Sequence, residues 1–205
     1  MSAVQFFFDP ACPWTWLTSR WLVDAAARRG VDVSWQSLSL VVVNGGELPE
    51  EHVAPARAAS AAHRLFAALD DAGRNDLVGA VYTEVGRRVH DGGEELTPEV
   101  VRQAATSAGA AWWLASLDDD RWDADVERST RRALELAGPD VGSPVLAHGS
   151  PPVGMFGPIV NPGPRGEDGA RLLDLVLELS TVDGLLELKR GRSSGPALPA
   201  PPPST

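Results

Sequence analysis

The sequence contains a single cysteine, Cys12, among its 205 residues. One cysteine cannot form a disulfide within the chain, so a structural disulfide framework and catalysis by two thiols of the same chain are both excluded. The apolar run near the N-terminus is too short for a secretory signal peptide. Together these features predict a cytoplasmic protein.

Lysine, long apolar runs and metal-binding clusters are also scarce. The only lysine is Lys189, and the formal net charge of −10 gives an acidic surface that disfavours binding to nucleic acid. No run of about 18 apolar residues occurs, so no membrane span is expected. The histidines lie far apart and no glycine-rich dinucleotide fingerprint is present, so we expect neither a metal site nor a nucleotide cofactor.

The N-terminal part of the chain has the pattern of a β-α-β unit. Residues 4–8 are a short apolar run, typical of a strand buried on both faces. Pro13 suits the first position of a helix that Gly30 ends, and its predicted apolar stripe comprises Trp14, Leu17, Trp21 and Ala25. A second strand begins at Val31. A shift in the apolar alternation near Gln36 predicts a bulge or a change of strand partner, followed by further strand through Val42.

The rest of the chain changes from helices back to strands. Alanine-rich amphipathic segments predict helices over 53–72, 77–89, 98–108, 110–117 and 121–137. Strands follow at 145–148 and 153–156, with a last helix over 166–179. This order predicts an α/β thioredoxin fold formed by residues 1–48 and 139–190, with an inserted all-helical domain at 49–138. The proline- and serine-rich residues 191–205 predict a disordered tail.

Cys12 lies at the junction between the first strand and the first helix. If Pro13 is the first helical residue, Cys12 is the N-cap and its sulfur faces the free N–H groups of Trp14 and Thr15. These donors and the positive helix end favour the thiolate, which predicts a pKa below the ordinary value of about 8.5. A lone cysteine is more often an inert buried residue, but the strand–cysteine–proline–helix order favours a nucleophile.

The residues around Cys12 resemble the active-site segment of DsbA-like thioredoxin-fold proteins. Residues 8–16 read Phe-Asp-Pro-Ala-Cys-Pro-Trp-Thr-Trp, most similar to the actinobacterial mycothiol-dependent nitroreductase branch. Other segments that look like this branch are residues 88–93, 141–144, 156–158, 164–166 and 187–190. The resemblance spans residues 4–190. It implies a thioredoxin fold, an oxidoreductase activity and a small thiol, such as mycothiol, as the cofactor.

Thr15 departs from the family pattern, because it stands where the pattern has its second, resolving cysteine. Without a second thiol the chain cannot alternate between a dithiol and an internal disulfide. We therefore expect monothiol chemistry, in which Cys12 attacks a disulfide or an electrophilic, nitroaromatic small molecule and an external thiol resolves the adduct. The Thr15 hydroxyl could stabilise the Cys12 thiolate. The alternative is a packing residue in a site that has lost its redox function.

Further candidates for the substrate- and thiol-binding site are Pro13, Trp14, Trp16, His90, Ser143 and Pro144. The resemblance implies a cis bond before Pro144, which would present the Ser143 backbone to a thiol-bearing ligand lying across Cys12. Trp14 and Trp16 flank Cys12 and could either wall a flat ligand or pack in the core. His90 precedes a Gly-Gly turn and could overhang the site; a solvated surface histidine is the alternative.

Two other functions fit the same sequence. One is a thiol-dependent transferase or isomerase resembling the kappa-class glutathione transferases and chromene-carboxylate isomerases, which typically carry serine where this chain has Cys12. The other is a redox-inactive binding module. In each case the expected partners are small molecules rather than nucleic acid or membrane, and the sequence leaves open whether the protein forms a homodimer.

Overall fold

A computed structural model describes residues 3–46 and 50–199. The elements of the N-terminal part are β1 (Val4–Phe8), α1 (Pro13–Arg29), β2 (Val33–Ser37) and α2 (Leu40–Val43). The helical middle contains α3 (Glu50–Asp71), α4 (Asn75–Gly86), the π-helical turn η1 (Arg87–Asp91), α5 (Pro98–Ser107), the 3-10 helices η2 (Ala111–Asp118) and η3 (Asp120–Trp122), and α6 (Asp123–Ala137). The chain then forms β3 (Val145–His148), β4 (Val153–Phe156) and α7 (Gly166–Leu179).

The four strands form one sheet in the order β2-β1-β3-β4. β1 pairs in parallel with β2, so that Phe6 lies opposite Trp35, and antiparallel with β3, where Phe6 lies opposite Leu146. β4 continues the sheet antiparallel to β3. The interior position of β1 explains its nearly continuous apolar sequence, because a strand covered on both faces needs apolar side chains on both. The predicted α/β thioredoxin arrangement is confirmed.

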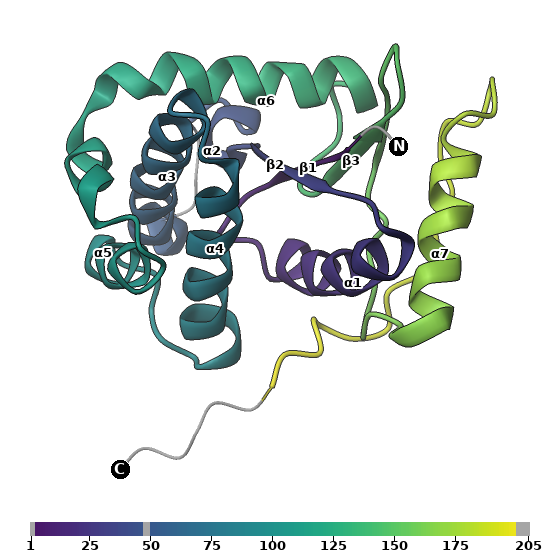
Figure 1. Cartoon of the computed structure of the whole chain (residues 1–205), viewed down its shortest axis with the longest axis horizontal. Helices are drawn as coiled ribbons and strands as arrows, with labels where there is room; N and C mark the ends of the chain where they lie inside the picture. The colour runs from purple at the N-terminus through teal and green to yellow at the C-terminus, as the bar shows by residue number, and fades with distance from the viewer. Residues whose placement is uncertain (1–2, 47–49, 200–205) are drawn as a thin grey trace.

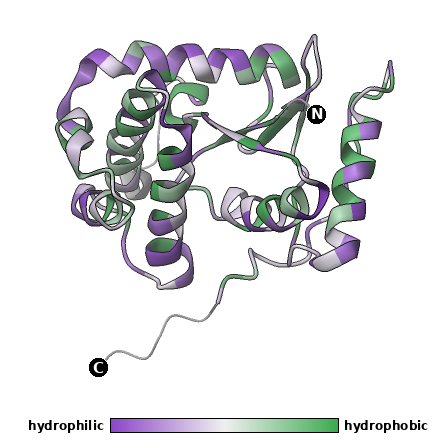
Figure 2. Ribbon diagram, viewed as in Figure 1, coloured by the Kyte–Doolittle hydropathy of each residue, from purple (hydrophilic) through white to green (hydrophobic). Residues whose placement is uncertain are grey.

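Helices cover both faces of this sheet (Figure 1). Phe6 and Phe8 of β1 belong to the larger core cluster, to which α1, α3 and α4 contribute. Phe7 points to the opposite face and packs in a second cluster with Ala133 of α6 and Val145 of β3. Apolar residues accordingly gather on the strands and on the helix surfaces turned towards them (Figure 2). α6, although predicted within the inserted domain, therefore covers one face of the sheet.

The segment after β2 differs from the prediction. We expected strand through Val42, but the strand ends at Ser37 and a short helix, α2, begins at Leu40. The Ser39 hydroxyl caps this helix by accepting a hydrogen bond from the Val42 N–H, and the Leu40 N–H donates to the Asp9 carboxylate. These two acceptors satisfy N–H groups that a helix start leaves free, so the apolar run folds as a helix.

The first turns of α1 are also buried differently from the predicted stripe. Trp21 and Ala25 are buried as expected, whereas Trp14 and Leu17 are half-exposed. Polar residues occupy the buried side instead. They can do so because their hydroxyls have partners: Thr18 donates to the Pro158 carbonyl and Ser19 to the Trp16 carbonyl.

The described C-terminal segment, residues 180–199, contains no helix or strand. The prediction of a disordered tail over 191–205 falls partly outside the described residues, which end at Pro199. Across the part of the chain that the structure describes, no helix is both long and apolar enough to span a membrane.

Candidate active site

Cys12 caps the N-terminus of α1, as predicted. Its backbone is extended (φ −86°, ψ 113°), Pro13 is the first helical residue, and the Cys12 N–H donates to the Asp9 carbonyl at 3.2 Å. The side chain is half-exposed, and its thiol donates to the Ser143 carbonyl over 3.8 Å. The thiol is therefore held against the loop that precedes β3.

The Ser143–Pro144 peptide bond is cis, as expected from the resemblance. The Ser143 hydroxyl accepts a hydrogen bond from the Asp9 N–H at 3.0 Å and lies 2.8 Å from the Thr15 hydroxyl. Thr15 is fully buried. This network joins the end of β1, the first turn of α1 and the loop before β3 directly beneath Cys12.

The expected depression of the Cys12 pKa is not what the structure shows. Burial is the largest influence and raises the pKa of the thiol, and the negative charge of Asp9 acts in the same direction. The nearby Thr15 hydroxyl and the backbone N–H groups of Thr15 and Trp14 lower the pKa, which is the effect we predicted, but burial outweighs them. The Cys12 side chain makes no capping hydrogen bond to the helix. Cys12 is thus protonated more readily than a free cysteine.

Asp9 organises the site and was not among the predicted residues. Its carboxylate is buried and accepts the N–H groups of Ala11 and Leu40, each at 2.8 Å. His63 of α3 is also buried and places its Nε2 3.5 Å from the same carboxylate. An Asp-Pro pair after a strand does suggest a turn. No sequence pattern predicts that His63, within an alanine-rich helix, will lie beside Asp9 in this turn.

His90 reaches the active-site loop from η1, but it is not the solvated histidine that we weighed as the alternative. The ring is buried and its Nε2 lies 2.9 Å from the Pro10 carbonyl, two residues before Cys12. Burial lowers the pKa of His90. The neutral ring therefore donates its Nε2 proton to that carbonyl. His90 thus stabilises the loop that precedes Cys12 through this hydrogen bond.

The two tryptophans beside Cys12 have different surroundings. Trp16 is buried, donates from its indole to Asp91 at 2.8 Å and stacks on His90, so it belongs to the core and not to a ligand wall. Trp14 is half-exposed, and the guanidinium of Arg192 lies over its ring, 4.9 Å from the centroid. Only Trp14 has a face that a ligand could reach.

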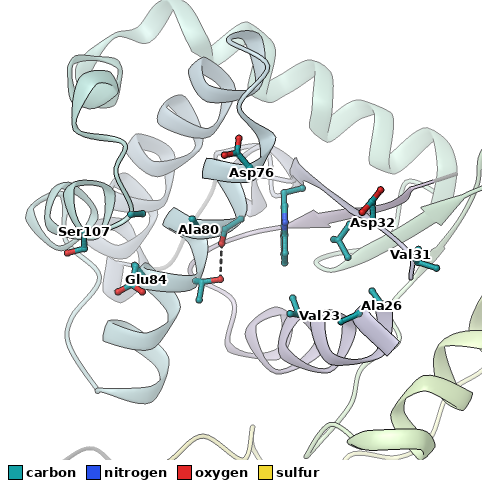
Figure 3. A pocket seen from close by; sticks show the side chains of 14 residues that line it. Val23, Ala26, Val31, Asp32, Asp76, Ala80, Glu84 and Ser107 are labelled. Carbon is teal, nitrogen blue, oxygen red and sulfur yellow. Dashed lines mark hydrogen bonds between the residues drawn. The ribbon is translucent and has the colours of Figure 1, made fainter. Parts of the chain in front are cut away.

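A cleft of about 530 Å³ lies away from Cys12. Its walls come from α1, β2 and α4, with Val23 and Ala26 on one side and Ala80 and Glu84 on the other (Figure 3). Neither Cys12 nor any other predicted site residue lines it. Over residues 3–46 and 50–199, no group of three or more metal-binding side chains is brought together.

Comparison with known proteins identifies the family. Residues 11–190 match the Rv2466c-like family, described as the mycothiol-dependent nitroreductase Rv2466c. The chain belongs to this family. The Rv2466c-like match includes Cys12 and Thr15, Ser143 and Pro144, and it ends before Gly191. The predicted resemblance to the mycothiol-dependent nitroreductase branch is confirmed.

Individual relatives agree with this assignment. The uncharacterized protein Rv2286c of Mycobacterium tuberculosis is 30% identical over 201 residues, spanning 94% of this chain and 84% of that protein. Among solved structures, the cytosolic disulfide reductase DsbM from Pseudomonas aeruginosa with GSH has a TM-score of 0.58 at 17% identity, covering 86% of this chain and 100% of that one. The probable DsbA oxidoreductase SCO1869 from Streptomyces coelicolor has a TM-score of 0.54 at 21% identity, covering 99% and 100%. Their similarity supports the thioredoxin fold, and the family makes the chain a thioredoxin-fold thiol oxidoreductase.

Proposed function

We propose that the protein is a monothiol oxidoreductase in which Cys12 forms a covalent adduct with its substrate, a mixed disulfide where the substrate is itself a disulfide, and a small external thiol releases Cys12. The observation that carries this proposal is the placement of the cysteine thiol at the start of α1, against the Ser143 carbonyl. The sequence holds no second cysteine that could resolve an adduct. The substrates would be disulfides or electrophilic, nitroaromatic small molecules.

For a disulfide substrate the chemistry balances with two external thiols. The Cys12 thiolate attacks one sulfur, forms a Cys12–substrate disulfide and expels the other sulfur as a thiolate, which takes up a proton. An external thiolate then attacks the substrate sulfur of the adduct and Cys12 leaves as thiolate. A second external thiol releases the remaining substrate thiol from the small mixed disulfide. The two external thiols end as one disulfide, and the substrate gains two electrons.

The raised pKa of Cys12 has two consequences for this cycle. Less thiolate is present at neutral pH, but each thiolate is a stronger nucleophile and a poorer leaving group. A poor leaving group slows the second step, so the Cys12 adduct should accumulate. A weakly stabilised thiolate also makes the thiol more reducing, because a strongly stabilised thiolate is what makes a dithiol protein a strong oxidant.

The surroundings of Cys12 fit a small thiol better than a bulky cofactor. The Ser143 backbone lies against the sulfur, and Trp14, two residues further on, is half-buried. Mycothiol, named in the family description, would supply the external sulfur when bound. In the protein itself, the Thr15 hydroxyl and the first N–H groups of α1 would hold negative charge on the Cys12 sulfur.

The test is intact-mass analysis of the protein after exposure to mycothiol disulfide, with glutathione disulfide as a comparison. We expect one small-thiol adduct per chain, located on Cys12, which excess mycothiol removes. The matched control is Cys12→Ser, which should form no adduct and lose turnover of mixed-disulfide and nitroaromatic substrates. Absence of an adduct at any concentration of the disulfide would contradict the proposal and leave the transferase or isomerase and the redox-inactive binding module.

One observation favours a second candidate, a thiol-dependent transferase or isomerase. Because burial raises its pKa, Cys12 remains largely a thiol at neutral pH and could donate its S–H to the thiolate of a bound thiol cofactor. A serine hydroxyl can perform the same role. Under this candidate Cys12→Ser would retain most of the activity, whereas under the monothiol mechanism it would retain almost none.

A further inference from the structure

The segment between Gly191 and Pro199 lies beyond the residues that match the family, yet it makes specific contacts. The side-chain amide of Asn161 binds the backbone of this segment through both its nitrogen and its oxygen. The Asn161 Nδ2 donates to the Gly195 carbonyl at 2.9 Å and to the Ser194 hydroxyl at 3.4 Å, while its Oδ1 accepts the Ala197 N–H at 2.7 Å. Leu198, next along the chain, packs against the larger core cluster.

The same segment reaches the exposed side of the active site. Arg192 places its guanidinium over the ring of Trp14, 4.9 Å from the centroid. Trp14 is the second residue after Cys12, and among the tryptophans that flank Cys12 it alone has an accessible face. The ring of Trp14 is therefore covered by a residue from a segment that the family match does not include.

The loop that carries Asn161 is itself fixed to α1. Thr18 donates to the Pro158 carbonyl, and Gly163 packs so closely on α1 that a Cβ there would lie 2.9 Å from Trp21. Asn161 is thus a rigid anchor, whereas the segment it holds has no helix or strand of its own. An amide anchor at one end and a cation–π contact at the other define a strap across the first turn of α1.

We propose that residues 192–198 form a strap that occupies the ligand-accessible face of Trp14 and competes there with substrates of Cys12, especially flat aromatic ones. The proposal deepens the proposed function and rests on it for its biological meaning. The contacts suit a reversible device. A cation–π pair at an exposed site and a few amide hydrogen bonds are individually weak, so the strap can open without unfolding any element.

The closing experiment measures access to Cys12 rather than turnover. Full-length protein is alkylated at one pH with iodoacetamide, which is small, and with N-(1-pyrenyl)maleimide, which is large and aromatic, and the ratio of the two rate constants is compared among variants. Asn161→Ala removes the anchor without changing charge. We expect it to raise the pyrenyl rate relative to the iodoacetamide rate by about two- to fivefold, the value of an exposed cation–π contact.

Two further variants of the strap and one control variant separate the effect of the strap from indirect effects. Ala197→Pro removes the backbone N–H that Asn161 accepts, leaves every side chain of the body intact, and should reproduce the Asn161→Ala ratio. Arg192→Ala should do the same. Arg190→Ala, which removes an equal charge from an exposed position two residues earlier, should leave the ratio unchanged.

The outcomes distinguish this proposal from the proposed function. An unchanged ratio in Asn161→Ala, Ala197→Pro and Arg192→Ala would overturn the strap, even if Cys12 forms thiol adducts normally. An equal change in Arg190→Ala would overturn it too, because the effect would then be one of charge alone. If the three strap variants raise the ratio of alkylation rates as expected but Cys12 forms no thiol adduct, the strap is supported and the monothiol mechanism is contradicted.

Discussion

The hydroxyl of Thr15 lies 2.8 Å from the hydroxyl of Ser143, and both side chains are buried. This contact joins the first turn of α1 to the loop before β3, the two segments that flank the Cys12 sulfur. Thr15 therefore does more than fill space in the core. It ties together the parts of the chain that position the nucleophile, and it also lowers the pKa of that nucleophile against the effect of burial.

Replacing Thr15 by valine should make Cys12 less reactive at neutral pH. The variant keeps the shape but removes the hydroxyl that lowers the pKa of Cys12, so the pKa should rise further. It also removes one partner of the Ser143 hydroxyl, which should destabilise the fold by about 1 kcal/mol. The rate of iodoacetamide alkylation against pH gives the first quantity, and urea unfolding gives the second.

The matched control is Thr15→Ser, which keeps the hydroxyl and removes only a methyl group. Its alkylation profile should superimpose on that of the wild type. If Thr15→Val and Thr15→Ser shift the profile equally, the hydroxyl has no influence on Cys12 and Thr15 is only a packing residue.

Asp9→Asn should lower the stability of the protein and raise the reactivity of Cys12. Both carboxylate oxygens accept buried N–H groups, from Ala11 and Leu40, and an amide can accept only one of them, a loss of about 1.5–3 kcal/mol. The negative charge of Asp9 raises the pKa of Cys12, so removing it should shift the alkylation profile to lower pH. Asp32→Asn, at an exposed position, should change neither quantity. A Cys12 pKa that rises in Asp9→Asn would show that the carboxylate acts by structure and not by charge.

Because of His90, the free energy of unfolding should decrease as the pH falls into the mildly acidic range. Burial lowers the pKa of His90 in the folded state, so the unfolded chain takes up the proton first. The free energy of unfolding contributed by His90 is therefore fully present above the ordinary histidine pKa of about 6.5 and is lost as the pH falls below it. Urea unfolding between pH 8 and pH 5 measures this dependence.

Comparison with His90→Phe isolates the contribution of this ring from that of the other histidines. Phenylalanine can still stack on Trp16 but cannot titrate or donate to the Pro10 carbonyl. It should be less stable than the wild type at pH 8, with the difference narrowing towards pH 5. Parallel stability curves for the two proteins would show that His90 protonates equally in both states.

Gly86→Ala should destabilise the protein even though alanine is the better helix former. A Cβ at position 86 of α4 would lie 2.2 Å from the ring of Trp16, which has no free space into which to move because it is buried. Overpacking should cost about 1–3 kcal/mol and the better helix propensity should offset up to about 1 kcal/mol, which leaves a net loss of up to about 2 kcal/mol. Gly191→Ala, with no atom within 4 Å, should be neutral. A stabilised Gly86→Ala would mean that Trp16 relaxes at little energetic expense.

The local structure around Cys12 followed from the sequence because it depends on neighbours in the chain. Pro13 has no N–H to lose at a helix start, and Gly30 adopts the left-handed conformation that ends α1 (φ 62°). The strand Val4–Phe8 and the two strands that follow the helical region were equally predictable, because most of their residues are apolar and turn residues bound them. The end of β2 was not, since Ser39 and the distant Asp9 carboxylate stabilise a helix where the apolar alternation suggested a strand.

The sequence alone determined which atom can be the nucleophile, where it lies on its helix, and that no second sulfur of the chain can resolve its adducts. Tertiary structure decided how that atom titrates. The N–H groups of its own helix lower the pKa of Cys12, but burial and the Asp9 charge oppose them and prevail. The burial of Cys12 depends on segments far away in the chain, such as the Ser143 loop against the thiol and η1 against the preceding Pro10. Tertiary packing brings these segments together, and a local sequence pattern does not predict it.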